Sequence, residues 1–256
     1  MSRSLFTASI LLGIFFLGSC AEHKAPDTAA TATPAAPDAT ATQDTARVSG
    51  QPCDIKLAGI HFTKAVNGAD TLAKTDAQGR MDFRVGAKKD FFCDPNDNKL
   101  SNNTAPILLA QVDNTKPFTL VAKVTPGFTA KGLYNAGVLY VYVNDRRWQK
   151  HCFEQDERGR HRIVSVRTLG TSDDNNHDVG TAPTAYMKIS SDTRTVASYY
   201  SLDKKTWQLV RLYKNDYPAT LWAGVSAQCP IDTGTTSHFE DISLTQNSVS
   251  DFRLGN

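Results

Sequence analysis

Long apolar runs, excess charge and cysteine are all scarce in this sequence. The one extended apolar run, residues 5–18, is shorter than the ~20 residues needed to span a bilayer, which excludes a multi-span membrane protein. The formal net charge of +2 is too small for a dedicated nucleic-acid binder. Aromatic residues make up 9% of the chain, so it is not disordered throughout. These absences leave an exported globular protein.

The first residues have the composition of a secretory signal peptide. Arg3 precedes the apolar run, and the small residues of LGS at positions 17–19 stand directly before Cys20. This arrangement resembles a bacterial lipobox, which implies that residues 1–19 are removed and that acyl chains on Cys20 anchor the protein to a membrane. Ala21, not aspartate, follows the cysteine. By the same resemblance we expect the outer membrane of a bacterial cell envelope, on either side. An ordinary signal peptide with an incidental cysteine is the alternative.

The segment that follows contains almost no large apolar side chain. Residues 20–52 are mainly Ala, Thr, Pro, Asp and Gln. Such a segment buries too little apolar surface to offset the entropy lost on ordering, so it is predicted to be a disordered linker. It separates the anchor from a folded domain over residues 53–256.

Short β-type runs dominate residues 53–256. Turn-forming residues separate most of them, as at positions 172–176 and 203–205. The expected strands are residues 55–62, 107–112, 118–124, 138–143, 162–168, 185–189, 195–201, 208–213, 221–228 and 238–244. No segment shows an amphipathic helix of three turns. The pattern predicts an all-β sandwich or barrel.

Two of the expected strands have distinct faces. In residues 221–228 the odd positions are apolar and predict the side facing the core, whereas the even positions, including Gln228, face solvent or a groove. In residues 148–154 one face carries Trp148, Lys150 and Glu154. An aromatic ring beside an amine and a carboxylate suits carbohydrate, because the ring packs on sugar C–H groups while the charged groups bond hydroxyls. A cross-strand ion pair beside a partly buried tryptophan is the alternative.

Six motifs occur together in a recognisable order. They are DFFCDP at residues 90–95, AGVL at 136–139, WQKHCFE at 148–154, SDD at 172–174, YSLDKKTW at 200–207 and AQCP at 227–230. Their joint order resembles the concanavalin-A-like lectin/glucanase family of domain of unknown function 1349, related to the "regulation of enolase" proteins. The resemblance covers most of residues 60–244. It implies a jelly roll of two antiparallel sheets with a concave face where relatives bind or cleave glycans, and it implies no particular reaction.

Strand parity and the resemblance together predict a non-catalytic carbohydrate-binding face. The residues expected to line this face or its rim are Asp90, Phe91, Trp148, Lys150, Glu154, Asp173 and Gln228. A glycoside hydrolase using Glu154 is one alternative, although the chain has no clear pair of alternating acids; Asp156 has the parity of Glu154 but follows the expected end of that strand. A structural or protein-binding lipoprotein is the other alternative.

No cofactor is expected. Residues 94–98 and 173–178 are rich in carboxylate and amide oxygens, which calcium binds, but both have ordinary turn composition. We expect turns and keep calcium at the second segment as an alternative.

Cys53, Cys93, Cys152 and Cys229 remain when Cys20 is set aside. In an exported protein four cysteines permit two disulfides, with three possible connectivities. Cys152 and Cys229 are assigned to the two groove faces, so a bond between them is one expectation.

Overall fold

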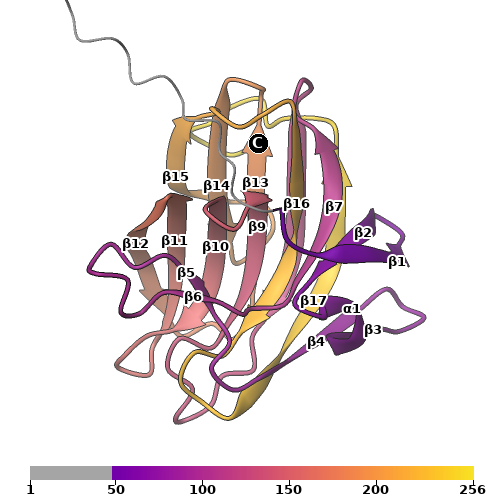
Figure 1. Cartoon of the computed structure of the whole chain (residues 1–256). Helices are drawn as coiled ribbons and strands as arrows, with labels where there is room; N and C mark the ends of the chain where they lie inside the picture. Colours follow the sequence, from indigo (N-terminus) through magenta and orange to yellow (C-terminus); the bar gives the residue numbers. More distant parts are fainter. Residues whose placement is uncertain (1–47) are drawn as a thin grey trace, which may run out of the picture. The chain divides into compact units, whose positions relative to one another are not determined.

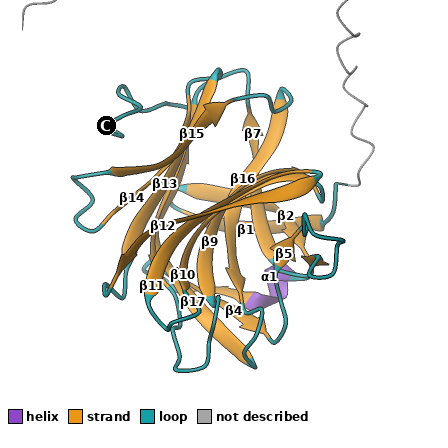
Figure 2. Ribbon diagram, turned by 90° about the vertical axis from the view of Figure 1, so that its left-hand side faces the viewer, coloured by secondary structure: helices purple, strands orange, loops and turns teal. Residues whose placement is uncertain are grey.

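Two antiparallel β-sheets pack face to face in the computed structural model, which describes residues 48–256 (Figure 2). The predicted all-β sandwich is confirmed. The expected signal peptide, the lipidation site Cys20 and most of the expected linker lie outside the described residues. Within the described part of the chain, no helix is long and apolar enough to cross a membrane.

The first sheet, called sheet A, has eight strands in the order β1-β2-β7-β16-β9-β10-β11-β12 (Figure 1). Its strands are β1 (Gln51–Leu57), β2 (Ile60–Val66), β7 (Ile107–Asp113), β16 (Thr220–Gln228), β9 (Ala136–Asn144), β10 (Arg147–Gln155), β11 (His161–Leu169) and β12 (Thr171–Gly180). The tight turn at residues 145–146 joins β9 to β10 and places them side by side at the centre of the sheet.

The second sheet, sheet B, has seven strands in the order β15-β14-β13-β8-β17-β4-β3. Its strands are β15 (Gln208–Lys214), β14 (Thr195–Ser201), β13 (Ala185–Ser191), β8 (Phe118–Thr125), β17 (Gly234–Thr245), β4 (Met81–Gly86) and β3 (Ala73–Thr75). The helix α1 (Ala69–Leu72) has four residues and connects β2 to β3.

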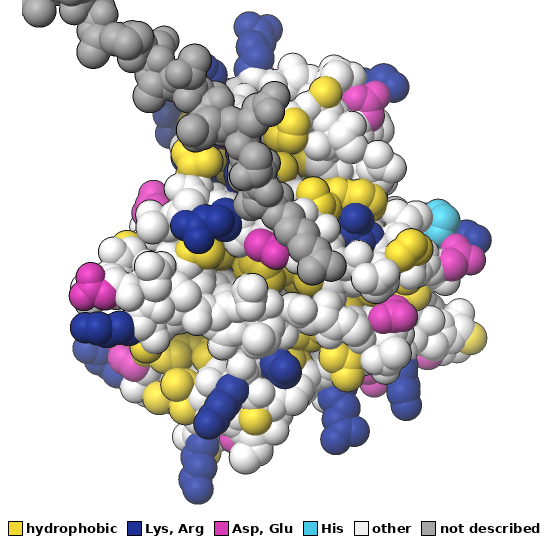
Figure 3. Space-filling model, in the orientation of Figure 1, with side chains coloured by type: hydrophobic (Ala, Val, Ile, Leu, Met, Phe, Trp, Pro, Cys, Tyr) yellow, Lys and Arg dark blue, Asp and Glu magenta, His cyan; other side chains and the backbone are white. Residues whose placement is uncertain are grey.

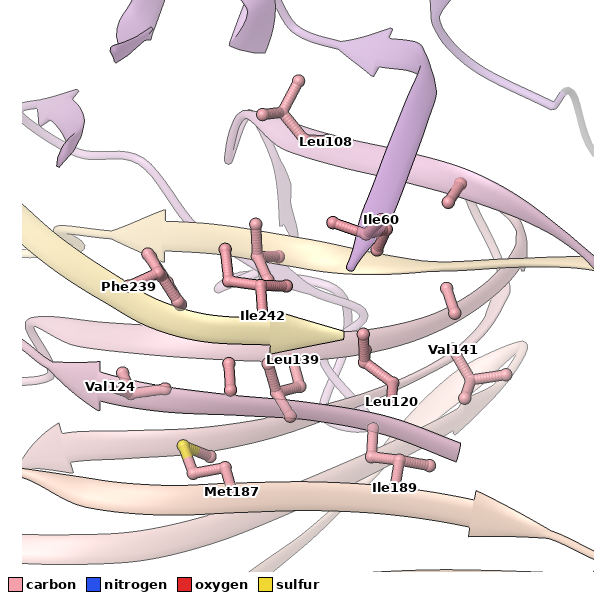
Figure 4. Close-up of a cluster of buried hydrophobic side chains, with 14 of the residues drawn as sticks. Ile60, Leu108, Leu120, Val124, Leu139, Val141, Met187, Ile189, Phe239 and Ile242 are labelled. Atoms are coloured by element: carbon pink, nitrogen blue, oxygen red, sulfur yellow. The ribbon is translucent and has the colours of Figure 1, made fainter. Parts of the chain in front are cut away.

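The main apolar core lies between the two sheets. Leu120 and Val124 of β8, with Met187 of β13, project from sheet B toward Leu139 and Val141 of sheet A (Figure 4). Along β8 such residues alternate with more exposed ones because successive side chains point to opposite faces, whereas β9 is apolar on both faces. The odd positions of residues 221–227 belong to this core, as their pattern predicts.

A segment that we call the covering loop, residues 87–106, lies across the outer face of sheet A, the face turned away from sheet B (Figure 1). It contains the short strands β5 (Phe91–Phe92) and β6 (Asn102–Asn103), which pair only with each other. Phe91 packs between Tyr142 and Trp148, with ring centroids 6.2 and 5.5 Å away. The loop thus creates a second apolar cluster on the outer face.

Two expectations about strands are wrong. Residues 55–62 form parts of two strands, because β1 and β2 make a hairpin with a turn at residues 58–59. Residues 172–176 belong to β12 and are not a turn. Asp and Asn have low strand propensity, but pairing with β11 holds this segment extended, and charged residues are common on edge strands.

The expected disulfides are also wrong, because all four described cysteines are free. Cys152 lies in the second apolar cluster on the outer face of sheet A, whereas Cys229 lies in the core between the sheets. Cys229 continues the alternation of Val225 and Ala227 toward the inner face. A bond between Cys152 and Cys229 would have to pass through the sheet.

Candidate functional site

The outer face of sheet A carries the alternating side chains of β10. Trp148 and Cys152 belong to the second apolar cluster on that face, and Phe153 belongs to the core on the other. Lys150 and Glu154 have the parity of Trp148 and so share its face. Gln228 of β16 lies on the same face, opposite the apolar odd positions of that strand. The shared face expected from the alternation of both strands is therefore confirmed, but the side chains on it are buried and do not face solvent.

Lys150 occupies the centre of this face. The residue is 3% exposed, and its Nζ donates to Asp90 Oδ1 at 2.8 Å and to Gln228 Oε1 at 3.0 Å. Burial alone would lower the pKa of the Lys150 ammonium, but the Asp90 carboxylate outweighs this effect and raises that pKa. Asp90 belongs to the covering loop, and its backbone carbonyl accepts hydrogen bonds from Thr104 and Ala105 on the returning arm. Lys150 therefore fastens the loop to the sheet.

Glu154 lies further along β10 and is 6% exposed. The Nε2 of Gln228 lies 3.5 Å from Glu154 Oε2 and donates to the backbone carbonyl of Tyr134 at 3.1 Å. Burial raises the pKa of the Glu154 carboxyl to about 8, although Lys150 opposes the shift. At neutral pH this carboxyl is therefore mostly protonated and able to donate a hydrogen bond.

Of the two adjacent acids in β12, Asp174 is the one that faces Lys150. Asp174 pairs across the ladder with Val166, which lies in the outer apolar cluster. Asp173 points the other way, and its carboxylate pairs with Arg211 of β15 at 3.1 Å. The expected place of Asp173 at the rim of the outer face is thus wrong. Turn composition gives no reason to expect Asp174 on this face, whereas the alternation of side chains along a strand does.

Asp174 completes what we call the polar centre: Asp90, Lys150, Glu154, Asp174 and Gln228. Desolvation by the surrounding protein raises the pKa of the Asp174 carboxyl; the charge of Asp90 adds to the rise, and Lys150 opposes it. Lys150 and Asp90 also act on Glu154, together with Asp174. Arg162 and Arg211, which lie outside the polar centre, oppose the rises at Glu154 and Asp174, but burial outweighs them, so both carboxyls have raised pKa values.

The two aromatic residues expected in the site, Phe91 and Trp148, are buried. The indole of Trp148 is 0% exposed, and the ring of Phe91 meets it edge-on, with an interplanar angle of 83°. The Nε1 of Trp148 donates to the backbone carbonyl of Asp145 at 3.3 Å. Neither ring presents a free face to a ligand, so an open aromatic floor is not present here.

Asp156, the acid that shares the parity of Glu154, has a structural role. Asp156 accepts hydrogen bonds from the backbone amides of Arg158 and Arg160, each at 2.8 Å, and pairs with Arg162 at 2.8 Å. Burial opposes the ionised form, but these bonds outweigh it and lower the pKa of the Asp156 carboxyl. Asp156 therefore caps the turn after β10 and is not a second acid beside Glu154.

The two candidate calcium segments differ from each other in structure. The carboxylate of Asp94 accepts backbone hydrogen bonds from Asn96 and Leu100, both at 2.9 Å, which is the turn arrangement expected there. Residues 173–178 lie on β12, where successive side chains alternate between faces. Among residues 48–256, no group of three His, Cys, Asp or Glu side chains converges in a way that holds a metal ion.

Several solved structures share this fold. A functionally unknown protein from Saccharomyces cerevisiae is 23% identical, with a TM-score of 0.64; the match covers 72% of this chain and 96% of that one. A bifunctional GH43-CE protein from Bacteroides eggerthii is 14% identical, with a TM-score of 0.52, covering 70% and 23%. A GH43 protein from Bacillus licheniformis is 15% identical, with a TM-score of 0.51, covering 66% and 33%. At these identities the likeness shows a common fold.

The match to a family model is more direct. No curated protein matches the chain. Residues 69–247, which run from α1 to beyond the end of β17 and include the whole polar centre, match the model described as "Protein of unknown function (DUF1349)". This confirms the family resemblance of the motifs. The chain belongs to the DUF1349 family.

Proposed function

We propose that this protein is an exported bacterial lipoprotein that binds carbohydrate through the outer face of sheet A. The anchor part of the proposal rests on the apolar run of residues 5–18 and on Cys20 directly after it. The binding part rests on the polar centre and on the fold. In this proposal residues 20–52 are the linker that carries the folded domain away from the membrane.

The observation that carries the binding proposal is that two carboxyls with raised pKa values lie close together in the polar centre. Glu154 and Asp174 both have raised pKa values and lie near one ammonium group, which Asp90 already pairs at 2.8 Å. Titratable groups perturbed in this way cluster at functional sites. The carboxylate of Asp174 is exposed and accepts hydrogen bonds, and the protonated carboxyl of Glu154 donates one, whereas the Gln228 amide is already bonded to Tyr134 and Glu154. Sugar hydroxyls need donors and acceptors together.

The fold supports carbohydrate as the ligand class. Sandwiches of the same fold occur in GH43 proteins. One is a GH43 glycoside hydrolase whose engineered active site gives both endo-xylanase and exo-arabinofuranosidase activity; it is 12% identical, with a TM-score of 0.55, covering 84% of this chain and 43% of that one. This chain spans less than half the length of that enzyme, so the enzyme's activity is not carried over. Association with glycans is the property that we propose for this domain.

A glycan array probed with the full chain in detergent tests the binding proposal. We expect retention of at least one glycan, weakened at least 10-fold by Asp174→Asn. The matched control is Asp173→Asn, because this neighbour points to the opposite face and pairs with Arg211. Retention of no glycan by the wild type, or equal losses in the two variants, would contradict the proposal.

The anchor is tested separately in cells. We expect the full chain to label with a radioactive fatty acid and to sediment with outer membranes. Cys20→Ser should abolish both, whereas Cys53→Ser should change neither. Sedimentation of Cys20→Ser with membranes as efficiently as the wild type would show that no acyl anchor is needed.

One observation favours an enzyme as the second candidate. Burial raises the pKa of Glu154 to about 8, and a carboxyl that is protonated at neutral pH is what a general acid in glycoside hydrolysis requires. Release of reducing sugar from a polysaccharide by the wild type, lost in Glu154→Gln, would favour the hydrolase. Capture of one stoichiometric protein and no sugar would favour a protein-binding lipoprotein instead.

A further inference from the structure

A cavity of about 580 Å³ opens where the covering loop meets the turn between β9 and β10. This volume lies in the usual range for small-molecule sites. β10 starts beside this turn, so the cavity lies at the end of the strand away from Glu154. Phe91 packs against Trp148 and stands in the chain between Phe92 of the cavity and Asp90 of the polar centre. The lining residues are Phe92, Cys93, Asn98, Ser101, Asn102, Asn103, Asp145 and Arg146.

Arg146 is the cation of this cavity. It is exposed, and its guanidinium donates one hydrogen bond to the backbone carbonyl of Gly170 at 3.0 Å. Within residues 48–256 no carboxylate lies within ion-pair distance of it. The carboxylate of its neighbour Asp145 instead accepts hydrogen bonds from the hydroxyls of Tyr142 and Ser49. Most of the N–H donors of Arg146 therefore remain available to a ligand.

The uncharged part of the lining offers amide and hydroxyl groups beside an aromatic ring. Asn103 is exposed and its side chain makes no hydrogen bond to the described residues. Asn98 accepts a bond from Ser101 at 3.4 Å, which leaves its amide N–H groups free. Phe92 is half-buried and forms the apolar part of the wall. This mixture matches a ring that carries several hydroxyls and an apolar C–H face.

Within the carbohydrate-binding function proposed above, we propose that this cavity binds a uronic acid residue of an acidic glycan. Arg146 binds the carboxylate with two parallel N–H···O bonds, the geometry that a guanidinium forms best. The amides of Asn98 and Asn103 bond the ring hydroxyls, and Phe92 packs on the ring. A singly charged carboxylate fits better than a phosphate dianion, because Asp145 offsets the charge of Arg146 and leaves the lining with no net positive charge.

The exposed surface agrees with a ligand that carries few charges. In the view of Figure 3, lysine and arginine side chains lie singly among uncharged atoms and form no continuous basic patch. A polyanion would need a continuous basic patch.

Calorimetric titration of the full chain with trigalacturonate and with its methyl ester tests the proposal. The ester keeps the sugar rings and their hydroxyls, but it lacks the carboxylate charge and carries a methyl group in its place. We expect the acid to bind at least 10-fold more tightly than the ester, and we expect this preference to shrink as salt is raised. Arg146→Gln should remove the preference, whereas Arg84→Gln, which alters an exposed arginine on β4 of sheet B, should keep it. Far-ultraviolet circular dichroism checks that each variant is folded.

Equal binding of acid and ester, or a preference that survives Arg146→Gln, would overturn the uronate site. Failure of this inference is distinguishable from failure of the proposed function. A neutral glycan that binds and depends on Asp174 but not on Arg146 leaves the proposed function standing without this cavity. If no glycan of either kind binds, both proposals fail.

Discussion

The two faces of sheet A are equally buried at their centres but differ in what covers them. On the inner face of β16, Leu221 and Val225 pack against a second sheet that is held by its own backbone hydrogen bonds. On the outer face of the same strand, Gln228 lies beneath a loop that is held to the sheet by Phe91 and by the Asp90–Lys150 ion pair. Burying a charged pair is a poor way to gain stability, because desolvation offsets the attraction. The outer face therefore serves to position groups, and the inner face to stabilise the fold.

The same contrast appears along β10 in its two buried titratable groups. Burial lowers the pKa of His151 on the inner face to about 4 and raises that of Glu154 on the outer face to about 8. Both shifts favour the neutral form, as expected when water is removed. Their consequences for stability are opposite. His151 resists gaining a proton, so it destabilises the fold as pH falls, whereas Glu154 resists losing one, so it destabilises the fold as pH rises.

The largest effect on the free energy of unfolding is expected from removing Lys150, the lysine of the buried ion pair. Lys150→Met leaves Asp90 and the Gln228 carbonyl without their partner, and should cost about 3–5 kcal/mol in the free energy of unfolding. The control is Lys123→Met: Lys123 pairs with Glu240 at 2.8 Å with a side chain 32% exposed, against 4% for Lys150, and its loss should cost about 0–1 kcal/mol. Urea unfolding followed by fluorescence measures both. Equal losses would show that the outer face gains nothing from the buried pair.

Phe91 and Phe92 test whether the loop is held by apolar packing as well. Phe91→Ala empties the space between Tyr142 and Trp148 and should cost about 3 kcal/mol. Phe92 is only half-buried, so Phe92→Ala should cost about 1 kcal/mol or less. Limited proteolysis should cut residues 94–101 faster in Phe91→Ala than in Phe92→Ala. Unchanged cleavage in both would mean that the ion pair alone holds the loop.

Measuring the free energy of unfolding over a series of pH values separates the effect of Glu154 on the outer face of β10 from that of His151 on the inner face. The folded state keeps the Glu154 proton up to about pH 8, whereas the unfolded chain loses it near 4.5. The folded state therefore binds more protons between these values, and stability falls as pH rises. Between pH 6.5 and 8 we expect a loss on the order of 1–2 kcal/mol. Glu154→Gln should abolish this loss in urea unfolding; a loss that persists in the variant would assign it to another group.

Lowering the pH is expected to destabilise the fold through His151. His151 binds a proton near pH 6.5 when unfolded and near pH 4 when folded, so stability falls as pH falls through this range. Glu154 opposes the trend above pH 4.5, and the loss should therefore be clearest in the Glu154→Gln background. There, between pH 6.5 and 5, His151→Gln should remove a loss on the order of 1–2 kcal/mol. His61→Gln, an exposed histidine beside Asp54, should leave it in place.

The smallest effect is expected from reducing agent. The four described cysteines are free and Cys152 and Cys229 lie on opposite faces of sheet A, so dithiothreitol should not move the urea midpoint. Thiol titration of the denatured chain without reductant should detect all four. A midpoint that falls on reduction would show that a disulfide does link the two faces.

Much of the fold could be predicted because strand alternation is local. The period-two pattern of residues 221–228 and 148–154 gave the correct faces. The rule was not applied to Asp173, because Asp and Asn are typical of turns; pairing with β11 overrode that preference. The missed strand is also the one that carries Asp174, so an error in one element removed one residue from the site. Propensity at an edge strand is weak evidence compared with a ladder of backbone hydrogen bonds.

The sequence by itself determined which side chains share a face, because the side-chain direction follows from position along a strand. Tertiary structure alone decided that a loop covers one of those faces, that Trp148 is buried and that Glu154 keeps its proton. These properties depend on contacts between residues distant in the chain: Lys150 and Asp90 are 60 positions apart, and Lys150 and Gln228 are 78 apart. Desolvation and ion pairing depend on which residues lie close together in space, and a local sequence pattern does not contain that information.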